Sequence, residues 1–253
     1  MTTFQILGRV CLRPDHGSSE ALDVKGVKAR ALLVTLLLRA GTTVSLDRLA
    51  EALWDEEPPR SAVANIRTHA SRLRRSFDAR TALLGTVGGY ELQVDADRCD
   101  HLRFLDRAAA GRAALEAGDP ARAAGRLAAA LALWQGDEAA VGVPRNGPLA
   151  AWLGHLDEER MRAVEDFADA QLQLAEPRSA LRDLAGLLAA APLRGRAWEL
   201  RMRAHHRLGE IDGVTAAYRA AEAVHRRELG TGPGARLDAL YRSLVNSAPV
   251  PVG

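Results

Sequence analysis

The stretch from Pro58 to Phe77, PPRSAVANIRTHASRLRRSF, says more about this chain of 253 residues than any other. Apolar side chains recur in it at the spacing of a helix face that packs on a core. These side chains are Val63, Ile66, Ala70, Leu73 and Phe77. The opposite face carries short polar groups and arginines: Ser61, Asn65, Thr68, Ser71, Arg72 and Arg75, with Arg67 and Arg74 on its flank.

This mixture of side chains is typical of a helix that enters the major groove of DNA. The guanidinium fork of arginine fits phosphate oxygens and the guanine edge, while Asn, Ser and Thr can reach either. From Arg60 to Arg80 the chain has six arginines and one acid, Asp78, although its net charge is only +2. Such a local basic patch is an electrostatic footprint for DNA. The alternative is an amphipathic helix whose polar face is simply solvated.

The elements around this helix predict an α+β domain. Strand character runs over residues 4–12, with a break at Gly8, and again over residues 21–24, after a turn at residues 14–19. Two helices are predicted before the basic one, at residues 27–39 and at residues 46–54 after the cap Ser45. Two short strands follow it, at residues 82–87 and 90–94, joined through Gly88 and Gly89.

Strands, three helices and a hairpin, with the basic helix third, are the layout of a winged helix-turn-helix. In that fold the third helix enters the major groove, and the hairpin can touch the neighbouring backbone or minor groove. A small α+β domain with no role in DNA binding is the alternative. We place this domain at residues 1–97.

The rest of the chain, residues 98–253, is predicted to be helical throughout. Helices are expected at residues 101–117, 120–134, 149–175, 178–190, 194–208, 211–229 and 234–245. Leu174-Ala175-Glu176 followed by Ala180 recurs 34 residues later as Leu208-Gly209-Glu210 followed by Val214. A helix pair that repeats at 34 residues is typical of tetratricopeptide repeats, whose stacked pairs form a concave surface for a protein partner. A plain helical bundle is the alternative. The predicted fold class is therefore mainly α, a winged helix-turn-helix followed by a tetratricopeptide-like domain.

No catalytic motif emerges from the sequence. It has neither a Gly-x-x-x-x-Gly-Lys-Ser/Thr loop nor a Gly-x-Ser-x-Gly elbow. Cys11 and Cys99 lack metal-ligand spacing, and no run of about 18 apolar residues is present to span a membrane. We therefore expect no enzymatic activity, no cofactor, no metal and no membrane partner. With no signal peptide in view, we expect a cytoplasmic, nucleoid-associated protein.

Several stretches together resemble a known family, the Streptomyces antibiotic regulatory proteins in their short, two-domain form. The resemblance runs from about Phe4 to Leu244. In the first half it rests on GVKARALL at residues 26–33, VSLDRLAEALW at 44–54, SRLRR at 71–75 and Gly89-Tyr90. In the second half it rests on ALEAGD at residues 114–119, ALALW at 130–134, APLR at 191–194 and ELG at 228–230.

The resemblance implies an OmpR-type winged helix followed by a bacterial transcriptional activation domain of tetratricopeptide-like helices. It implies an activator that binds double-stranded DNA as two copies on direct repeats near the promoter −35 element. It also implies recruitment of RNA polymerase holoenzyme through the sigma factor and core subunits, at genes for secondary-metabolite biosynthesis.

The resemblance also implies roles for single residues. Arg67, Thr68 and Arg72 occupy positions that reach bases. Candidates for phosphate or flanking contacts are Asn65, His69, Ser71, Arg74 and Arg75, and Thr86 and Tyr90 match hairpin positions that approach the backbone. The hairpin tip departs from the family because it lacks a basic residue, and residues 136–148 receive no role.

Two rival functions stay open. In one, the chain is a tetratricopeptide-like adaptor whose arginine face docks an acidic protein. In the other, the helical domain senses a small molecule and the chain is a ligand-responsive regulator.

Overall fold

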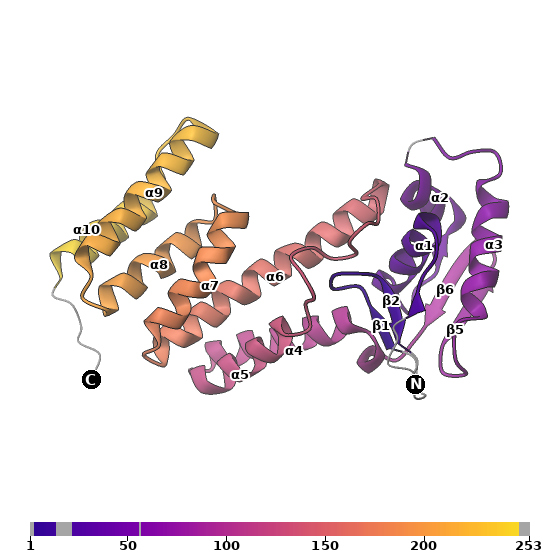
Figure 1. Ribbon diagram of the computed structural model, residues 1–253, viewed down its shortest axis with the longest axis horizontal. Helices are drawn as coiled ribbons and strands as arrows, with labels where there is room; N and C mark the ends of the chain where they lie inside the picture. Colours follow the sequence, from indigo (N-terminus) through magenta and orange to yellow (C-terminus); the bar gives the residue numbers. More distant parts are fainter. Residues whose placement is uncertain (1–2, 14–21, 56, 248–253) are drawn as a thin grey trace. The chain divides into compact units, whose positions relative to one another are not determined.

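The computed structural model describes residues 3–13, 22–55 and 57–247, so the predicted turn at residues 14–19 lies outside the described residues. The chain divides into two compact units. The first, here called the winged unit, comprises Met1–Asp106 and Ala132–Glu159. The second, the helical unit, comprises Arg107–Leu131 and Arg160–Gly253. Figure 1 shows the strands and α1 to α3 in the winged unit and α7 to α10 in the helical unit.

In the winged unit the described strands form two small antiparallel sheets, and three α-helices lie wholly within it. One sheet has the order β1-β2-β3, and the other has the order β4-β6-β5. The strands are β1 (Thr3–Gln5), β2 (Cys11–Arg13), β3 (Leu22–Asp23), β4 (Val44–Ser45), β5 (Ala82–Thr86) and β6 (Gly89–Gln93). The helices are α1 (Val27–Leu38), α2 (Leu46–Trp54) and α3 (Ala62–Arg74), and a short 3₁₀ turn, η1 (Ala96–Arg98), follows the hairpin.

The strand character predicted over residues 4–12, with its break at Gly8, corresponds to two antiparallel strands, β1 and β2. β1 pairs with β2, with Phe4 opposite Leu12. The break predicted at Gly8 is confirmed, since Gly8 adopts a φ of +122°. A Cβ there would lie 2.9 Å from the carbonyl oxygen of Gln135, so only glycine lets the two chain segments approach this closely.

The wing hairpin is also shifted from its prediction. Its turn consists of Val87 and Gly88, while Gly89 belongs to β6 and pairs with both Thr86 and Ser45. Gly88 supplies the positive φ, +86°, that a tight turn requires. Gly89 is needed for a different reason: a Cβ there would overlap the backbone carbonyl of Val44 in β4.

The predicted cap of α2 is confirmed, because Ser45 Oγ accepts a hydrogen bond of 3.3 Å from the backbone N–H of Arg48. Directly before it, β4 joins the wing sheet, and the backbone N–H of Leu46 donates to Gly88 O at 2.8 Å. The start of α2 therefore holds the base of the wing.

The segment at residues 136–148, which received no role from the sequence, completes the winged unit. Val141 donates to Gly8 O at 2.8 Å, and Ala140 donates to Ile6 O at 2.7 Å. On the other side, the carboxylate of Asp100 accepts from the backbone N–H groups of Ile6 and Leu7. Residues far apart in the sequence thus provide hydrogen-bond partners for the backbone groups of one buried segment, residues 6–8.

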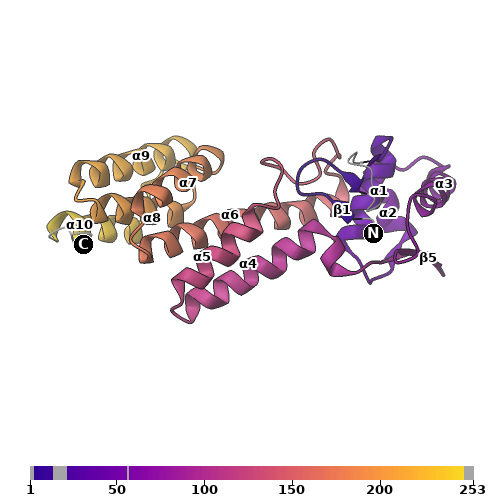
Figure 2. The same ribbon diagram turned by 60° about the horizontal axis from the view of Figure 1, so that its bottom comes forward.

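The helical unit consists of helix pairs. The predicted helices are confirmed to within a few residues: α4 (Asp100–Glu116), α5 (Pro120–Leu131), α6 (Gly147–Gln173), α7 (Pro177–Ala190), α8 (Gly195–Arg207), α9 (Ile211–Leu229) and α10 (Ala235–Asn246). α4 and α6 contribute residues to both units. Figures 1 and 2 show α8 beside α7 and α9, which agrees with their contacts. Leu184, Trp198, Met202, Val214 and Leu237 belong to the core that these helices share.

The motif that recurs after 34 residues corresponds to two similar turns between helices. Ala175, between α6 and α7, has a φ of +59°, and Gly209, between α8 and α9, has a φ of +74°. In each turn the next residue, Glu176 or Glu210, donates its N–H to a carbonyl five residues earlier. Ala180 and Val214, which follow at the same spacing, are both fully buried. Among the described residues, none of the helices is both long enough and apolar enough to cross a membrane.

Candidate nucleic-acid interface

Helix α3 packs one face on α1 and α2 and presents the other to solvent. Ala62, Ile66, Ala70 and Leu73 are buried, as an apolar stripe at helical spacing requires. Val63 was expected in this stripe, but the expectation is wrong: Val63 is 37% exposed. Ala62, at the first position of α3, occupies the buried side of this turn instead, so the stripe is turned away from Val63.

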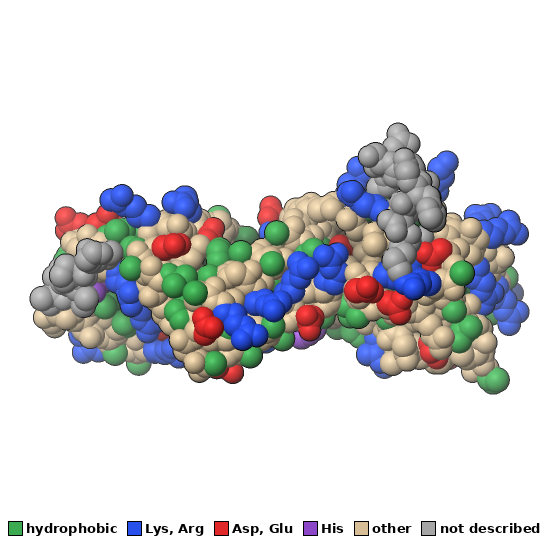
Figure 3. Space-filling view, turned by 90° about the horizontal axis from the view of Figure 1, so that it is seen from below, with side chains coloured by type: hydrophobic (Ala, Val, Ile, Leu, Met, Phe, Trp, Pro, Cys, Tyr) green, Lys and Arg blue, Asp and Glu red, His purple; other side chains and the backbone are tan. Residues whose placement is uncertain are grey.

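The outer face of α3 carries the predicted polar and basic side chains. Asn65, Arg67, Thr68, Ser71, Arg72 and Arg75 are all exposed. Arg67, Arg72 and Arg75 form no ion pair with acidic residues in the part of the chain that the structure describes. In Figure 3, Lys and Arg side chains gather along the right-hand end of the molecule, over the position of α3. A convex basic helix of this kind can enter a groove lined by phosphates.

Two polar side chains on this face are partly held by the helix itself. Thr68 Oγ1 donates to Ala64 O at 3.0 Å, four residues earlier. Asn65 Nδ2 donates to Ser61 Oγ at 3.3 Å. Each bond restricts a side chain but leaves its oxygen free to accept from a partner.

His69 lies at the edge of this face and is partly buried. Burial lowers the pKa of the imidazole, and the nearby charge of Arg72 lowers it further. The free protein therefore presents a neutral His69 at pH 7. Its Nδ1 atom is buried and has no hydrogen-bond partner among the described residues.

The structure brings Arg74, the last residue of α3, together with the wing. Arg74 Nε donates to Leu83 O in β5 at 2.8 Å, and its guanidinium carbon lies 5.6 Å from the ring centroid of Tyr90. Tyr90 is only 8% exposed, so its ring is a packing surface beneath Arg74. Thr86, by contrast, is exposed at the far end of β5.

Sequence reasoning missed the side chain at the tip of the wing. Val87 is fully exposed, and Leu84 in β5 is 41% exposed. The sequence indicated only that the tip of the wing lacks a basic residue. Because the turn was predicted one residue too late, Val87 was not identified as the side chain at the tip.

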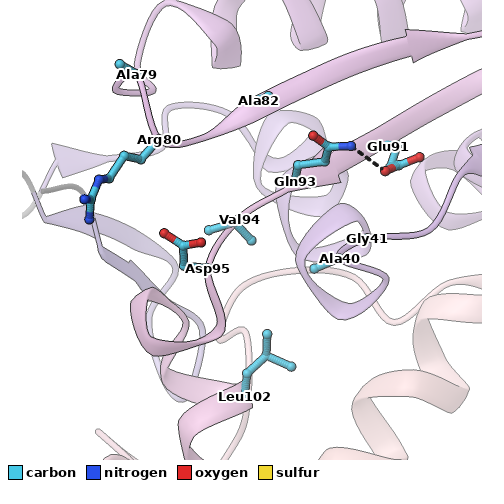
Figure 4. A pocket seen from close by; sticks show the side chains of 10 residues that line it. All are labelled: Ala40, Gly41, Ala79, Arg80, Ala82, Glu91, Gln93, Val94, Asp95 and Leu102. Carbon is cyan, nitrogen blue, oxygen red and sulfur yellow. Dashed lines mark hydrogen bonds between the residues drawn. The ribbon is translucent and has the colours of Figure 1, made fainter.

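A cavity of about 690 Å³ lies on the opposite face of the wing sheet. Figure 4 shows it lined by Glu91 and Gln93 of β6, which are hydrogen-bonded at 3.0 Å, and by Arg80, Asp95 and Leu102. Two carboxylates in the lining make this face unsuited to a phosphate backbone. The α3 face is therefore the candidate interface with nucleic acid.

A winged helix-turn-helix with an arginine-bearing third helix, joined to an all-helical unit, defines a class of bacterial transcriptional regulators. Residues 6–90 match the family described as "Transcriptional regulatory protein, C terminal". Residues 99–245 match the family described as "Bacterial transcriptional activator domain". The two matches fall on the winged helix and on the helices that follow it.

Three known proteins illustrate the similarity. The regulatory protein AfsR of Streptomyces coelicolor is 38% identical over 97% of the chain, although the chain spans only 24% of the length of AfsR. The regulatory protein DnrI of Streptomyces peucetius is 31% identical, over 92% of the chain and 89% of DnrI. The structure of Mycobacterium tuberculosis EmbR in complex with a low-affinity phosphopeptide is 27% identical with a TM-score of 0.88, over 98% of this chain and 66% of that one.

These findings confirm the predicted resemblance: the chain belongs to the Streptomyces antibiotic regulatory protein family, and it carries both domains that characterise it.

Proposed function

We propose that this protein is a sequence-specific DNA-binding transcriptional activator of secondary-metabolite (antibiotic) biosynthesis genes. The observation that carries the proposal is the outer face of α3, where Arg67, Arg72 and Arg75 are exposed and unpaired among the described residues. Exposed arginines without acidic partners contribute little to the stability of the fold, and their charge favours a polyanion. The proposed DNA-binding domain ends near residue 97.

Within this proposal, three side chains read bases in the major groove: Arg67, Thr68 and Arg72. Asn65, His69, Ser71 and Arg75 contact phosphates or flanking positions, and Thr86 approaches the backbone from the wing. Tyr90 acts indirectly, because its ring is buried under Arg74. Phosphate contacts position the helix, and the few base contacts provide the sequence preference.

A single winged helix reads a short site, so we propose that two copies bind a direct repeat near the −35 element. The second copy adds affinity through effective concentration. The helical unit then contacts RNA polymerase holoenzyme, including the sigma factor, and recruits it. Activity in the cytoplasm, on the nucleoid, follows from this role.

The test is a gel-shift titration of the protein on promoter fragments from its own gene neighbourhood, with and without holoenzyme. We expect saturable binding to a direct repeat that survives competition by random duplex and strengthens when holoenzyme is added. Affinity should fall with salt, by about 0.9 log unit per log unit of salt for each phosphate contacted. Binding no tighter than to random DNA would contradict the proposal and favour a protein-interaction adaptor.

A further inference from the structure

The guanidinium group of Arg74 covers the open edge of the wing. β5 is an edge strand, since the sheet order is β4-β6-β5. Arg74 Nε donates to the carbonyl of Leu83 in this strand at 2.8 Å. Its Nη2 atom lies over Gly85, where an added Cβ would be only 3.5 Å away. The side chain thus runs along the strand from Leu83 towards Gly85.

This contact joins α3 directly to the far strand of the wing. On its other edge the wing is held through the pairing of β4 with β6 and the hydrogen bond from Leu46 N to Gly88 O, and its buried inner face packs on α1 and α3. A hydrogen bond from a charged donor is roughly twice as strong as a neutral one, and an arginine over an aromatic ring adds a further attraction. Arg75, the next residue, is exposed and makes no such contact.

We propose that Arg74 is a positioning residue that fixes the angle between α3 and the wing, and thereby determines where the wing meets DNA. This inference rests on the DNA-binding function proposed above. It reassigns Arg74, which the family resemblance placed among the phosphate contacts. The guanidinium shape is essential to the role, because lysine has the charge but no Nε–H to reach Leu83 O and no planar group to lie over Tyr90.

The experiment compares Arg74→Lys and Arg74→Ala with the matched pair Arg75→Lys and Arg75→Ala. The probe is a duplex that the wild-type protein has selected from a randomised pool. We expect Arg74→Lys to bind about tenfold more weakly than wild type, close to Arg74→Ala, because neither variant has a planar group that donates to Leu83 O and lies over Tyr90 at the same time. Arg75→Lys should bind more tightly than Arg75→Ala, because a phosphate contact depends mainly on the charge, so the two Arg75 variants differ where the two Arg74 variants agree.

Hydroxyl-radical footprints separate positioning from a general loss of structure. With Arg74→Lys, the protection at the flank contacted by the wing should weaken, while the protection by α3 persists. The salt dependence should match that of wild type, since no charge is removed. A cooperative unfolding transition with a midpoint well above the temperature of the binding assay shows that the domain remains folded.

A second pair of variants leaves Arg74 itself intact. Gly85→Val places γ-methyl groups where the guanidinium lies, whereas Gly85→Ala adds only a methyl at van der Waals distance. Valine is well suited to a strand, so the wing should still form. We expect Gly85→Val to reproduce the binding loss and altered footprint of Arg74→Lys, and Gly85→Ala to resemble wild type.

If Arg74→Lys binds within about twofold of wild type and keeps the whole footprint, Arg74 is a phosphate contact and the inference is wrong. If the wild-type protein selects no site from the pool, the proposed function fails and the inference fails with it. Specific wild-type binding combined with a silent Arg74→Lys therefore distinguishes the two failures.

Discussion

On α3 of the winged unit, Arg67, Arg72 and Arg75 are exposed, whereas in the helical unit arginines reach buried carboxylates. Arg194 holds Glu165 with two hydrogen bonds, of 2.9 and 2.8 Å, and Arg196 lies against Asp166. Within the winged unit, Arg98 behaves like the second group, because it is buried and pairs with Asp78 at 2.7 Å. Arginine content alone therefore says little about DNA binding. The informative observation is an exposed arginine that forms no ion pair within the described residues.

The buried acids of the two units differ in the same way. Glu165 in the helical unit is neutralised by a guanidinium group. Asp100 in the winged unit instead accepts hydrogen bonds from the backbone N–H groups of Ile6, Leu7 and His101. Dipoles stabilise a buried charge less completely than an opposite charge does, so we expect the two acids to respond differently to the removal of their partners.

The largest effect is expected from Arg194→Ala. Glu165 is 3% exposed, so removing its partner leaves an unpaired buried charge. Such a loss typically destabilises a protein by about 3–5 kcal/mol, measured by urea or thermal unfolding. Arg226→Ala is the control: its ion pair with Glu222 lies at the surface, with the arginine 69% exposed, and should contribute less than about 1 kcal/mol.

A double variant, Arg194→Ala with Glu165→Met, tests the reason for that loss. Because both charges are removed, much of the stability should return. A double variant as unstable as Arg194→Ala would show that packing by the arginine side chain, and not the orphaned carboxylate, is responsible.

The second prediction concerns the pH dependence of the winged unit. Burial raises the pKa of Asp100 from the ordinary 3.8 to about 6, and burial lowers the pKa of the adjacent His101 from 6.5 to about 4. For Asp100 the folded state binds more protons than the unfolded state, so its contribution to stability is present below pH 4 and is lost as pH rises to 6. For His101 the folded state binds fewer protons, so its contribution grows as pH rises from 4 to 6.5. In the wild type these two slopes oppose each other.

Substituting either residue should reveal the pH dependence that the other residue contributes to the free energy of unfolding. In His101→Gln, the free energy of unfolding should fall relative to wild type by up to about 1.4 kcal/mol per pH unit between pH 4 and 6. In Asp100→Asn it should rise relative to wild type over the same range. Urea titrations at several pH values measure both differences. Parallel curves for the three proteins would show that neither group is perturbed.

The third prediction tests the exposed arginines. Arg72→Ala should leave the unfolding midpoint unchanged, because the side chain is exposed and unpaired among the described residues. If Arg72 reads a base, the variant should lose about 1–3 kcal/mol of binding to its specific site and discriminate less against random DNA. Arg75→Ala should weaken specific and random binding alike and reduce the salt slope by about one unit. Unchanged binding of both DNAs by Arg72→Ala would refute the assignment of this residue.

The sequence predicted most of the element order because the signals are local. Pro58 and Pro59 end one segment, Ser45 caps α2 as expected, and the bounds of α9 agree with prediction. It could not predict β4, because a strand of only two residues exists only through its pairing with β6. Nor could it predict the β-bridge of Val141 with Arg9 and the hydrogen bond from Val141 N to Gly8 O, which join segments separated by more than half of the chain.

The candidate interface shows the same limit. Helical periodicity correctly predicts that Arg67, Thr68 and Arg72 are exposed, because the period of about 3.6 residues determines which face of the helix each residue occupies. It misplaces Val63, which lies at the border of the buried stripe, where a small rotation of the helix decides exposure. The contact of Arg74 with Leu83 depends on how the wing folds back on α3, and no local pattern contains that information.

The smallest change in stability is expected at the two turns of the helical unit that contain the motif recurring after 34 residues. Ala175 adopts a φ of +59°, which is unfavourable for a residue with a Cβ, whereas Gly209 meets the same demand at +74° without strain. Ala175→Gly should therefore stabilise the unit by up to about 1 kcal/mol, less than the full strain because glycine also gains freedom in the unfolded chain. Gly209→Ala should destabilise it by a similar amount. Opposite shifts of the thermal midpoint would show that both turns require a positive φ to a similar extent. Shifts of the same sign would show that the two turns differ in this requirement despite their similar geometry. Neither variant should alter DNA affinity, because both turns belong to the helical unit, whereas the exposed arginines of α3 belong to the winged unit.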